Sequence, residues 1–498
     1  LLFQGERGRG KSSLTKHDKR KQEERGGVFP HVMICLWILL SLSLQSTTMA
    51  SRCEEARETL DKNWVGSSTI PAFGLYPHQW SWDTAFITYG HATYNTTKAQ
   101  IELESLFEGQ WENGLLPHIV FNPNVAPSAY FPGSDYWLSS TMSNDLAPLG
   151  VETSGIVNPP VHVSAVLNLV RRDPSSPQTA SFLHRIYPKL SRWMGYLLNE
   201  RDPDGNSLVY IRHPWESGMD NAPQWDAVLD NITVPSGSIP PYHRTDLNHS
   251  NPKDRPSNWT YDRFVFLMIC ARNRSYSEAA ISASDGTGCP FIVEDPLFNS
   301  ILVQAAKDMA ELALLLKPAN PTESKHWMEV ASRVAKALES LWSDELRMLA
   351  SRDMRTKKPL LSRVIAGFAP LLIRQPFPGG PPSYYDNLLR SLQSPATFWS
   401  QYGVPTLAID DPRFNRRLYW RGPAWYNMDW LFLRGLQTVG SNATDTVAEG
   451  LLNRMESMVD ESGMREYWDP LNGTAHGTNS FSWTAALHLD VFCDQNVN

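Results

Sequence analysis

The stretch from Leu302 to Leu341, LVQAAKDMAELALLLKPANPTESKHWMEVASRVAKALESL, shows most directly how this chain folds. Apolar residues recur in it at a spacing of about 3.6, the period of one face of an α-helix. Asn320 and Pro321 interrupt the pattern, and they are typical of a helix start, with asparagine as N-cap and proline in the first turn. The stretch therefore predicts two helices joined by a short turn. Their apolar stripes are Leu302, Ala305, Ala306, Met309, Leu312, Ala313 and Leu316, then Trp327, Val330, Ala331, Val334, Leu338 and Leu341.

The same periodicity recurs along the chain and gives about a dozen predicted helices with few strand-like alternations. The further segments lie near residues 83–93, 98–111, 160–172, 179–200, 261–272, 383–394, 424–437, 443–459 and 481–492, with weaker ones near 53–63 and 363–374. The loops between them are rich in Pro, Gly, Asn and Trp. Several are longer than about 15 residues, and loops of that length in a compact domain are usually functional or disordered. This pattern predicts an all-α protein, an (α/α)6 barrel whose long loops form an active-site cup.

The first fifty residues differ from the rest. Residues 7–25 are basic and polar, which predicts disorder. Residues 32–44 are mostly apolar but shorter than the roughly 20 residues of a membrane span, as in the hydrophobic region of a signal peptide. We therefore expect residues 1–50 to be a disordered basic segment followed by a signal peptide or signal anchor over 28–50. Residues 51–498 are expected to form a single catalytic domain.

This N-terminal pattern favours the secretory pathway, with an extracellular or vacuolar destination. The alternative is a cytoplasmic protein whose translation starts at Met49. Membrane contact is expected only if residues 28–44 remain as an uncleaved anchor. Seven glycosylation sequons favour the secretory route. They are Asn95, Asn231, Asn248, Asn258, Asn273, Asn442 and Asn472.

Composition limits the possible partners. The net charge of −7 argues against nucleic acid as a ligand. Beyond residue 50 there are four cysteines, and their spacing does not suggest a zinc site. If they are oxidised they allow three pairings, and the alternative is free buried thiols. These cysteines are Cys53, Cys270, Cys289 and Cys493.

Two acidic segments set among tryptophans suggest the chemistry. The first, Trp215–Asp226, reads WESGMDNAPQWD, and the second, Met464–Asp469, reads MREYWD. Apolar neighbours raise the pKa of a carboxyl group, so Asp220 is suited to act as a general acid. Glu466 is the candidate general base, because two carboxyl groups of different acidity are the minimal equipment for glycoside hydrolysis.

Each assignment has a structural alternative. The acids of the first segment, Glu216, Asp220 and Asp226, would then only cap turns or pair with arginines. Glu466 would be a surface residue beside Arg465. On the same segment, two other carboxylates compete for the role of base, Glu461 and Asp469.

Two further aromatic segments fit a sugar-binding wall, because indole rings stack on the apolar face of a sugar. The first contains Trp80, Trp82 and Asp83, where the acid can accept bonds from sugar hydroxyls or, alternatively, cap the helix that follows. The second is the segment Leu418–Tyr426, LYWRGPAWY, whose aromatics bind sugar or, alternatively, pack in the core.

Five motifs occur in order along the chain and together resemble glycoside hydrolase family 63. The resemblance is strongest to its compact, single-barrel branch, which hydrolyses mannosylglycerate and glucosylglycerate, and it covers about residues 55–492. The motifs are QWSWD (79–83), GQWENGLLPH (109–118), ESGMDN (216–221), YWRGP (419–423) and FSWTAA (481–486).

The resemblance implies an (α/α)6 barrel and hydrolysis with inversion at the anomeric carbon. It implies that Asp220 is the general acid and Glu466 the general base, as the residues themselves suggest. It also implies which side chains surround the glycosyl ring. These are Tyr76, Trp80, Trp82, Asp83, Trp420 and Trp425.

On the glycerate side, hydrolases of this branch use an arginine and a tyrosine six residues apart, and Arg255 and Tyr261 have that spacing. The guanidinium fork suits a carboxylate, and the alternative is an ion pair of Arg255 with Asp254 or Asp262. Further candidates for this side are Tyr130, Tyr419 and Asn158. Asn158 stands where the family pattern has glutamine, and Ser480 marks a second departure, so the acceptor contacts are expected to differ from the family pattern.

These assignments predict a single displacement on a small anionic glycoside, with the two carboxyl groups about 6.5–9.5 Å apart. No metal or organic cofactor is implied. One alternative is an α-glucosidase acting on an oligosaccharide or a trehalose-like disaccharide. A second alternative is a non-catalytic carbohydrate-binding barrel. The sequence leaves open the choice between mannosyl and glucosyl substrates and the oligomeric state.

Overall fold

The computed structural model describes residues 49–249 and 251–494, and Arg52–Asn498 forms one compact unit. The predicted disordered segment and nearly all of the predicted signal peptide fall on residues 1–48, outside the described residues. Within the described part of the chain, no helix combines the length and apolar character needed to cross a bilayer.

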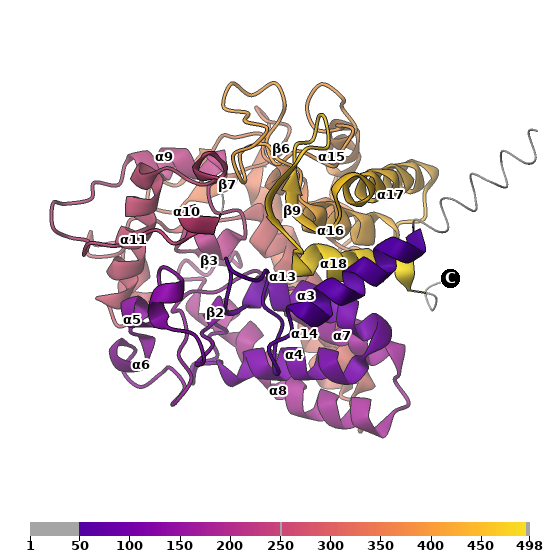
Figure 1. The fold of residues 1–498 in the computed structure, drawn as a ribbon, viewed down its shortest axis with the longest axis horizontal. Coiled ribbons are helices and arrows are strands. Elements are labelled where there is room, and N and C mark those ends of the chain that lie inside the picture. The colour runs from indigo at the N-terminus through magenta and orange to yellow at the C-terminus, as the bar shows by residue number, and fades with distance from the viewer. Residues whose placement is uncertain (1–48, 250, 495–498) are drawn as a thin grey trace, which may run out of the picture. The chain divides into compact units, whose positions relative to one another are not determined.

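Six helical segments form a closed inner ring in which each packs against the next and the last returns to the first (Figure 1). In chain order they are α3 (Ser81–Tyr94), α7 (His162–Arg172), α13 (Pro296–Leu315), η6 (Ile365–Leu372), α16 (Tyr426–Leu436) and α18 (Ser482–His488).

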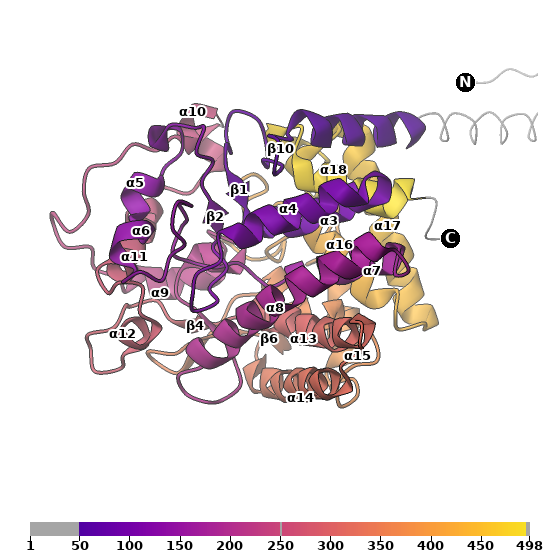
Figure 2. The ribbon, with the colours of Figure 1, turned by 90° about the horizontal axis from the view of Figure 1, so that it is seen from below.

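Each inner segment is partnered by an outer helix, as Figure 2 shows for α13 and α14. The outer helices are α4 (Thr96–Glu108), α8 (Pro177–Glu200), α14 (Pro321–Leu338), α15 (Tyr385–Leu392) and α17 (Asn442–Ser462). A helix over residues 52–62 takes the last outer position, held by a disulfide from Cys53 to Cys493 and by a hydrogen bond from Arg52 to the carbonyl of Asp460 in α17. The predicted (α/α)6 barrel is thus confirmed.

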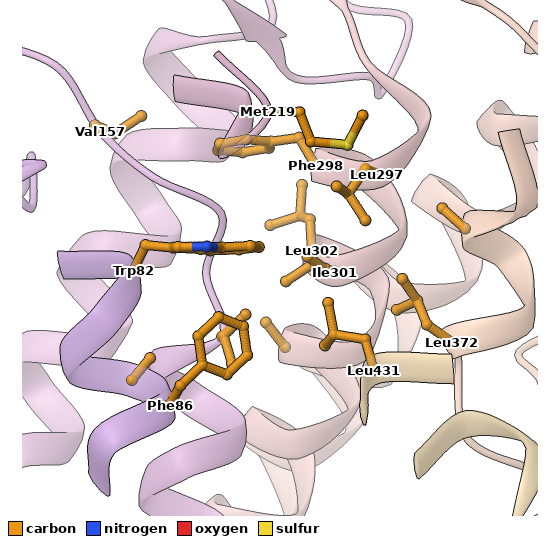
Figure 3. Close-up of a cluster of buried hydrophobic side chains, with 14 of the residues drawn as sticks. Trp82, Phe86, Val157, Met219, Leu297, Phe298, Ile301, Leu302, Leu372 and Leu431 are labelled. Atoms are coloured by element: carbon orange, nitrogen blue, oxygen red, sulfur yellow. The ribbon is translucent and has the colours of Figure 1, made fainter. Parts of the chain in front are cut away.

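The two rings differ in sequence because they differ in burial. Helix α13 is buried along nearly its whole length and is apolar on most sides, whereas α14 buries one stripe that includes Trp327 and Val334. At the centre of the barrel, Trp82 and Phe86 of α3 face Ile301 and Leu302 of α13 (Figure 3). This apolar cluster is the floor on which the loops at one end of the barrel rest.

Two ring positions are not regular α-helices. The segment predicted as a helix near residues 363–374 is the 3₁₀ helix η6, which contains Pro370. Proline lacks the N–H that an α-helical hydrogen bond requires, so an α-helix is disfavoured here. Helix α18 continues into a π-helical turn, η7 (Leu489–Cys493).

Further helices and 3₁₀ turns lie in the loops, and all of them except α11 (Asn258–Arg272) are short. They are α5 (Ser134–Trp137), α6 (Ser139–Met142), α9 (Asp226–Asp230), α10 (Asp246–His249), α11 (Asn258–Arg272), α12 (Glu278–Ser282), η1 (Pro127–Ala129), η2 (Pro214–Ser217), η3 (Pro223–Trp225), η4 (Pro252–Asp254) and η5 (Glu339–Leu341).

The sequence did not reveal the short strands, because strands of two to five residues show little alternation. All pairs are antiparallel. β3 (Tyr210–Ile211), β4 (Val293–Glu294), β7 (Ser351–Asp353) and β8 (Lys358–Leu360) form one sheet, in that order. The pairs are β1 (Gln79–Trp80) with β2 (Ile119–Val120), β5 (Trp342–Ser343) with β6 (Met348–Leu349), and β9 (Arg465–Trp468) with β10 (Ala475–Asn479).

The cysteine pairing that the sequence left open is Cys53–Cys493 and Cys270–Cys289, so the four described cysteines are not free thiols.

Candidate active site

A pocket opens at the end of the barrel where the inner helices begin. Trp82 and Asp83 reach it from the first turn of α3, Trp425 from the residue before α16, and Trp483 from the start of α18. The long loops supply the other walls. The remaining lining residues are Pro71, Tyr76, Trp80, His118, Ile119, Tyr130, Pro132, Trp137, Asn158, Trp215, Gly218, Asp220, Tyr419, Trp420, Glu466 and Phe481.

Glu466 is held in place by three donors. It lies on β9 with 1% of its surface exposed, so it is not the surface residue of the alternative interpretation. Its carboxylate accepts hydrogen bonds from the Tyr76 hydroxyl (2.8 Å) and the Thr478 N–H (2.9 Å), and it pairs with Arg255 (3.2 Å). All three groups donate, so they complement a carboxylate rather than a carboxylic acid, whose own O–H needs an acceptor.

A register shift in the β9–β10 hairpin produces the Thr478 contact. Pairing is regular at His476, which faces Tyr467, and shifts before Asn479. The intervening Gly477 has a φ of +67°, in the left-handed region that favours glycine. Such a bulge re-aims the backbone next to a site, and here it turns the Thr478 N–H toward Glu466.

Asp220 lies on the loop that follows the 3₁₀ helix η2. Burial raises its pKa to about 7, an effect that Arg255 opposes and the charge of Glu466 adds to. The loop turns at Gly218, where φ is +74° and an added Cβ would lie 3.1 Å from the ring of Trp82. A carboxyl group that still holds its proton near neutral pH can donate it to a leaving group.

The other carboxylates of the two acidic segments have structural partners. Glu216 pairs with Arg201, and Asp226 pairs with Arg421. Asp469 pairs with Arg416, and neither Asp469 nor Glu461 lines the pocket. Within each segment, the carboxylate that lines the pocket is therefore the one favoured by the sequence.

Asp83 is a third acid in the pocket. Helix α3 begins at Ser81 with Trp80 as N-cap, so Asp83 lies inside the first turn and is not the cap. Burial raises the pKa of Asp83 well above its ordinary value, and Glu466 and Asp220 add to this effect. Trp80 and Trp82 both line the pocket, although only Trp80 is in the extended strand β1.

Stacked aromatics form one wall. The rings of Trp420 and Trp425 are parallel with centroids 3.9 Å apart, and Tyr467 stacks on Trp425 from behind. On the other wall, Tyr130 meets the edge of Trp80 at 4.9 Å. The alternative role of Trp420 and Trp425 as core packing also holds, since both are almost fully buried.

Several lining residues carry buried polar atoms that have no hydrogen-bond partner within the described protein. A ligand rich in hydroxyl groups matches such atoms, because an unpaired buried donor or acceptor costs about 1–3 kcal/mol. Asn158 is the clearest case, since its Nδ2 donates to the Trp215 carbonyl (3.0 Å) and its Oδ1 is unpaired. The unpaired atoms are Asn158 Oδ1, Trp82 Nε1, His118 Nδ1, Trp137 Nε1 and Trp483 Nε1.

Arg255 and Tyr261 do not line the pocket. Arg255 lies behind it, where its guanidinium contacts Glu466 and the Tyr76 hydroxyl and lies over the ring of Tyr419, 4.8 Å from its centroid. The carboxylate of Asp254 pairs instead with Arg417.

Tyr261 lies one layer behind the pocket wall. Its hydroxyl donates to the Phe131 carbonyl (3.1 Å), and its ring lies against Trp215. Asp262 accepts a hydrogen bond from the hydroxyl of Tyr242. The sequence offered an ion pair of Arg255 with Asp254 or Asp262 as an alternative, but the structure shows Arg255 paired with Glu466.

Reasoning from the residues did not assign roles to several parts of the pocket. His118, Phe481 and Trp483 belong to motifs that carry the family resemblance, and that was their only signal. Gly477 and Thr478 gave no signal, because their effect depends on the bulge in the hairpin.

Comparison with known proteins agrees with this geometry. The family model described as the mannosylglycerate hydrolase MGH1-like glycoside hydrolase domain matches residues 76–484. A mannosylglycerate hydrolase of Rubrobacter radiotolerans is 41% identical over 442 residues, which cover 88% of this chain and 96% of that protein. A glucosylglycerate hydrolase of Mycolicibacterium hassiacum is 34% identical, with 90% of this chain and 98% of that protein covered.

A solved structure extends the comparison to three dimensions. The crystal structure of GH63 mannosylglycerate hydrolase from Thermus thermophilus, in complex with Tris and D-glycerate, matches with a TM-score of 0.77 and 37% identity. The match covers 88% of this chain and 98% of that one. Fold, family model and full-length relatives agree: this chain is a glycoside hydrolase of family 63 and belongs to its MGH1-like mannosylglycerate hydrolase branch.

Proposed function

We propose that this protein hydrolyses 2-O-α-mannosylglycerate or 2-O-α-glucosylglycerate with inversion of configuration. In this proposal Asp220 is the general acid and Glu466 the general base. One observation carries it: the two carboxyl groups line the same pocket in different surroundings, since burial raises the pKa of Asp220 to about 7 whereas Glu466 is surrounded by hydrogen-bond donors.

The reaction proceeds in one displacement. Asp220 transfers its proton to the oxygen that links the sugar to glycerate, and that C–O bond breaks at the anomeric carbon. A water molecule attacks the same carbon from the opposite face, and Glu466 takes a proton from this water. The products are the β-anomer of the sugar and glycerate, and Asp220 and Glu466 then exchange their protonation states through solvent.

The sugar ring is placed between the aromatic walls. Trp420 and Trp82 offer flat apolar surfaces to its C–H face. Asp83, whose pKa is raised, can donate to one hydroxyl and accept from another. Mannose and glucose differ in the configuration of a single hydroxyl group, so we propose both sugars as substrates.

The glycerate carboxylate requires a cation. Among the described residues that line the pocket, none is lysine or arginine. The guanidinium of Arg255 contacts the lining residues Glu466 and Tyr76, and we propose that it reaches the carboxylate by sharing its fork between the substrate and Glu466. Tyr130, Tyr419 and Asn158 line the pocket and are proposed glycerate contacts, with Tyr261 supporting the wall behind them.

The same observation favours a second candidate within the family. A pocket surface without a cation also suits a neutral α-linked disaccharide, so an α-glucosidase acting on a trehalose-like disaccharide is the competing function. Membership of a hydrolase family with both acids present leaves the non-catalytic barrel without support.

A substrate panel separates these possibilities. The purified protein is incubated with mannosylglycerate, glucosylglycerate, trehalose, kojibiose and nigerose, and each product is followed by NMR that resolves its anomers. The proposal expects the β-sugar from one or both glycerates and at least tenfold slower hydrolysis of the neutral disaccharides. Release of the α-anomer, or faster cleavage of a neutral disaccharide, contradicts it.

We also propose a secretory location. Support comes from the two disulfides and from the seven sequon asparagines, all of which are exposed. Disulfides form mainly in oxidising compartments. Expression of the full chain in a eukaryotic secretory host should give a glycoprotein whose mass falls on enzymatic removal of N-glycans. Retention in the cytosol with unmodified asparagines contradicts the proposal.

A further inference from the structure

Four charged side chains are buried together behind the loop that carries Asp220. They are two arginines and two glutamates, so the cluster as a whole is neutral. None of them lines the pocket. The members are Arg201, Arg212, Glu216 and Glu278, each no more than 4% exposed.

The carboxylate of Glu216 accepts four hydrogen bonds. Arg201 forms a two-pronged pair with it, Nη1 to Oε2 at 3.0 Å and Nη2 to Oε1 at 2.9 Å. The backbone N–H groups of Arg212 (2.7 Å) and Val157 (3.1 Å) donate to the same carboxylate. Burial alone would raise the pKa of Glu216, but these partners, Arg201 foremost, hold it below its ordinary value.

These bonds join two pocket walls that are distant in sequence. Val157 precedes Asn158, whose Nδ2 donates to the carbonyl of Trp215 and whose Oδ1 is unpaired in the pocket wall. The guanidinium of Arg212 donates to the carbonyl of Gly155. Three bonds therefore fasten the segment 155–158 to the loop that leads to Asp220.

The segment has little room to adjust. A Cβ at Gly155 would overlap the ring of Tyr276, so the backbone there is packed against an aromatic face. On its far side, the acid loop is held by Asn221, whose Oδ1 accepts the N–H of Trp420 (2.9 Å). A small shift of the Glu216 carboxylate consequently moves Asn158 and Asp220 relative to one another.

We propose that Glu216 is a positioning residue for proton transfer to the leaving group. Its carboxylate fixes the distance between the Oδ1 of Asn158, which holds the glycerate side of the substrate, and the acidic proton of Asp220. The proposal rests on the function proposed above, because it requires Asp220 to be the general acid. It predicts that loss of Glu216 impairs only the step in which the leaving oxygen receives a proton.

Two substrates with the same sugar isolate that step. Departure of glycerate requires a proton from the acid, whereas fluoride leaves an α-glycosyl fluoride without one. In Glu216→Gln the shape of the side chain is kept and its charge is lost. We expect kcat for the glycosylglycerate to fall about 10²-fold, the scale of general acid catalysis, and kcat for the α-glycosyl fluoride to change less than about threefold.

Glu278→Gln is the matched control. It removes a charge from the same buried cluster, but Glu278 bonds to Tyr196, Tyr210 and the two arginines rather than to the pocket walls. Each variant is assayed at the same interval below its own unfolding temperature. Glu278→Gln should keep the wild-type ratio of kcat on the glycosylglycerate to kcat on the α-glycosyl fluoride. Glu216→Asp keeps the charge that compensates Arg201 but withdraws the carboxylate from Val157, so it serves if Glu216→Gln does not fold.

The outcomes separate the two proposals. If Glu216→Gln and Glu216→Asp lose activity on both substrates equally, or if Glu278→Gln shows the same selective loss, Glu216 has no positioning role. Asp220→Asn is measured beside them. If it hydrolyses the glycosylglycerate at the wild-type rate, the acid assignment itself fails, whatever the behaviour of Glu216.

Discussion

Gly477 lies directly across the β9–β10 hairpin from Glu466. A Cβ added to Gly477 would stand 2.7 Å from the Cβ of Glu466 and would overlap its carboxylate. Its φ of +67° also disfavours any side chain. Glu466, the proposed general base, therefore occupies space that exists only because residue 477 has no side chain.

Gly477→Ala should consequently lower kcat by about 10²-fold, since small misplacements of a catalytic group have effects of that size. The matched control is Gly473→Ala in the same hairpin, where φ is +73° and the added Cβ would meet Tyr402 at 2.6 Å. Both changes should lower the unfolding temperature, but only the first should lower kcat well beyond its effect on stability. Equal losses of kcat in the two variants contradict the role of Gly477.

The two carboxyl groups should respond differently to a change of leaving group. Asp220→Asn should lose about 10²–10⁴-fold in kcat on the glycosylglycerate and retain most activity on the α-glycosyl fluoride. Glu466→Gln should lose activity on both, because water must still be deprotonated. Steady-state kinetics on the two substrates tests this, and the reverse pattern would exchange the two roles.

The pH dependence follows from the pKa of about 7 at Asp220. A general acid must hold its proton, so kcat/KM for the glycosylglycerate should be maximal below pH 7 and fall tenfold per pH unit above it. The α-glycosyl fluoride should not show this basic limb. If activity instead began to fall with rising pH from about pH 4, Asp220 would be ionised at neutral pH and could not act as the acid.

Arg255 should matter more for an anionic substrate than for a neutral one. Arg255→Lys keeps a positive charge near Glu466 but removes the fork, so kcat/KM for the glycosylglycerate should fall about 10–100-fold, the value of one or two charge-assisted bonds. The α-glycosyl fluoride, which has no carboxylate, should lose less than about threefold. Arg417→Lys, next to it in space through Asp254, is the control and should leave both rates unchanged. Equal losses on both substrates would assign Arg255 to Glu466 alone.

The two disulfides should contribute unequally to stability. Cys53 and Cys493 are 440 residues apart, whereas Cys270 and Cys289 are 19 apart. Because longer closed loops restrict the unfolded chain more, Cys53→Ser should destabilise the protein by roughly 3 kcal/mol more than Cys270→Ser. Urea unfolding of the two variants measures the difference, and a larger effect of Cys270→Ser would contradict the argument.

Local features of the fold could be predicted from the sequence. Helix α14 begins at Pro321 with Asn320 as N-cap, because both preferences act within a single turn. The inner and outer helices follow from apolar periodicity. The 3₁₀ form of η6 could not be predicted in this way, because its composition is typical of a buried α-helix apart from Pro370.

The site was less accessible to the sequence. Asp220 and Glu466 stand out in the sequence because they lie among tryptophans. The partner of Arg255 does not, because Glu466 is 211 residues away and the charges next to Arg255 suggested Asp254 or Asp262 instead. The sequence favoured Asp220 as the acid, but it could not show that Glu216 is bound by Arg201 while Asp220 lines the pocket. Pairings of this kind depend on how the barrel closes, which leaves no periodic trace.

The bond between Cys53 and Cys493 makes the barrel a covalent ring, since every inner helix lies between these two residues. A single protease cut in the largely exposed loop of residues 235–243 would leave one nicked molecule that separates into two fragments only on reduction. The same closure allows circular permutation: a short linker between the helix at 52–62 and η7, with new ends in that loop, would reproduce a connection that the folded chain already has.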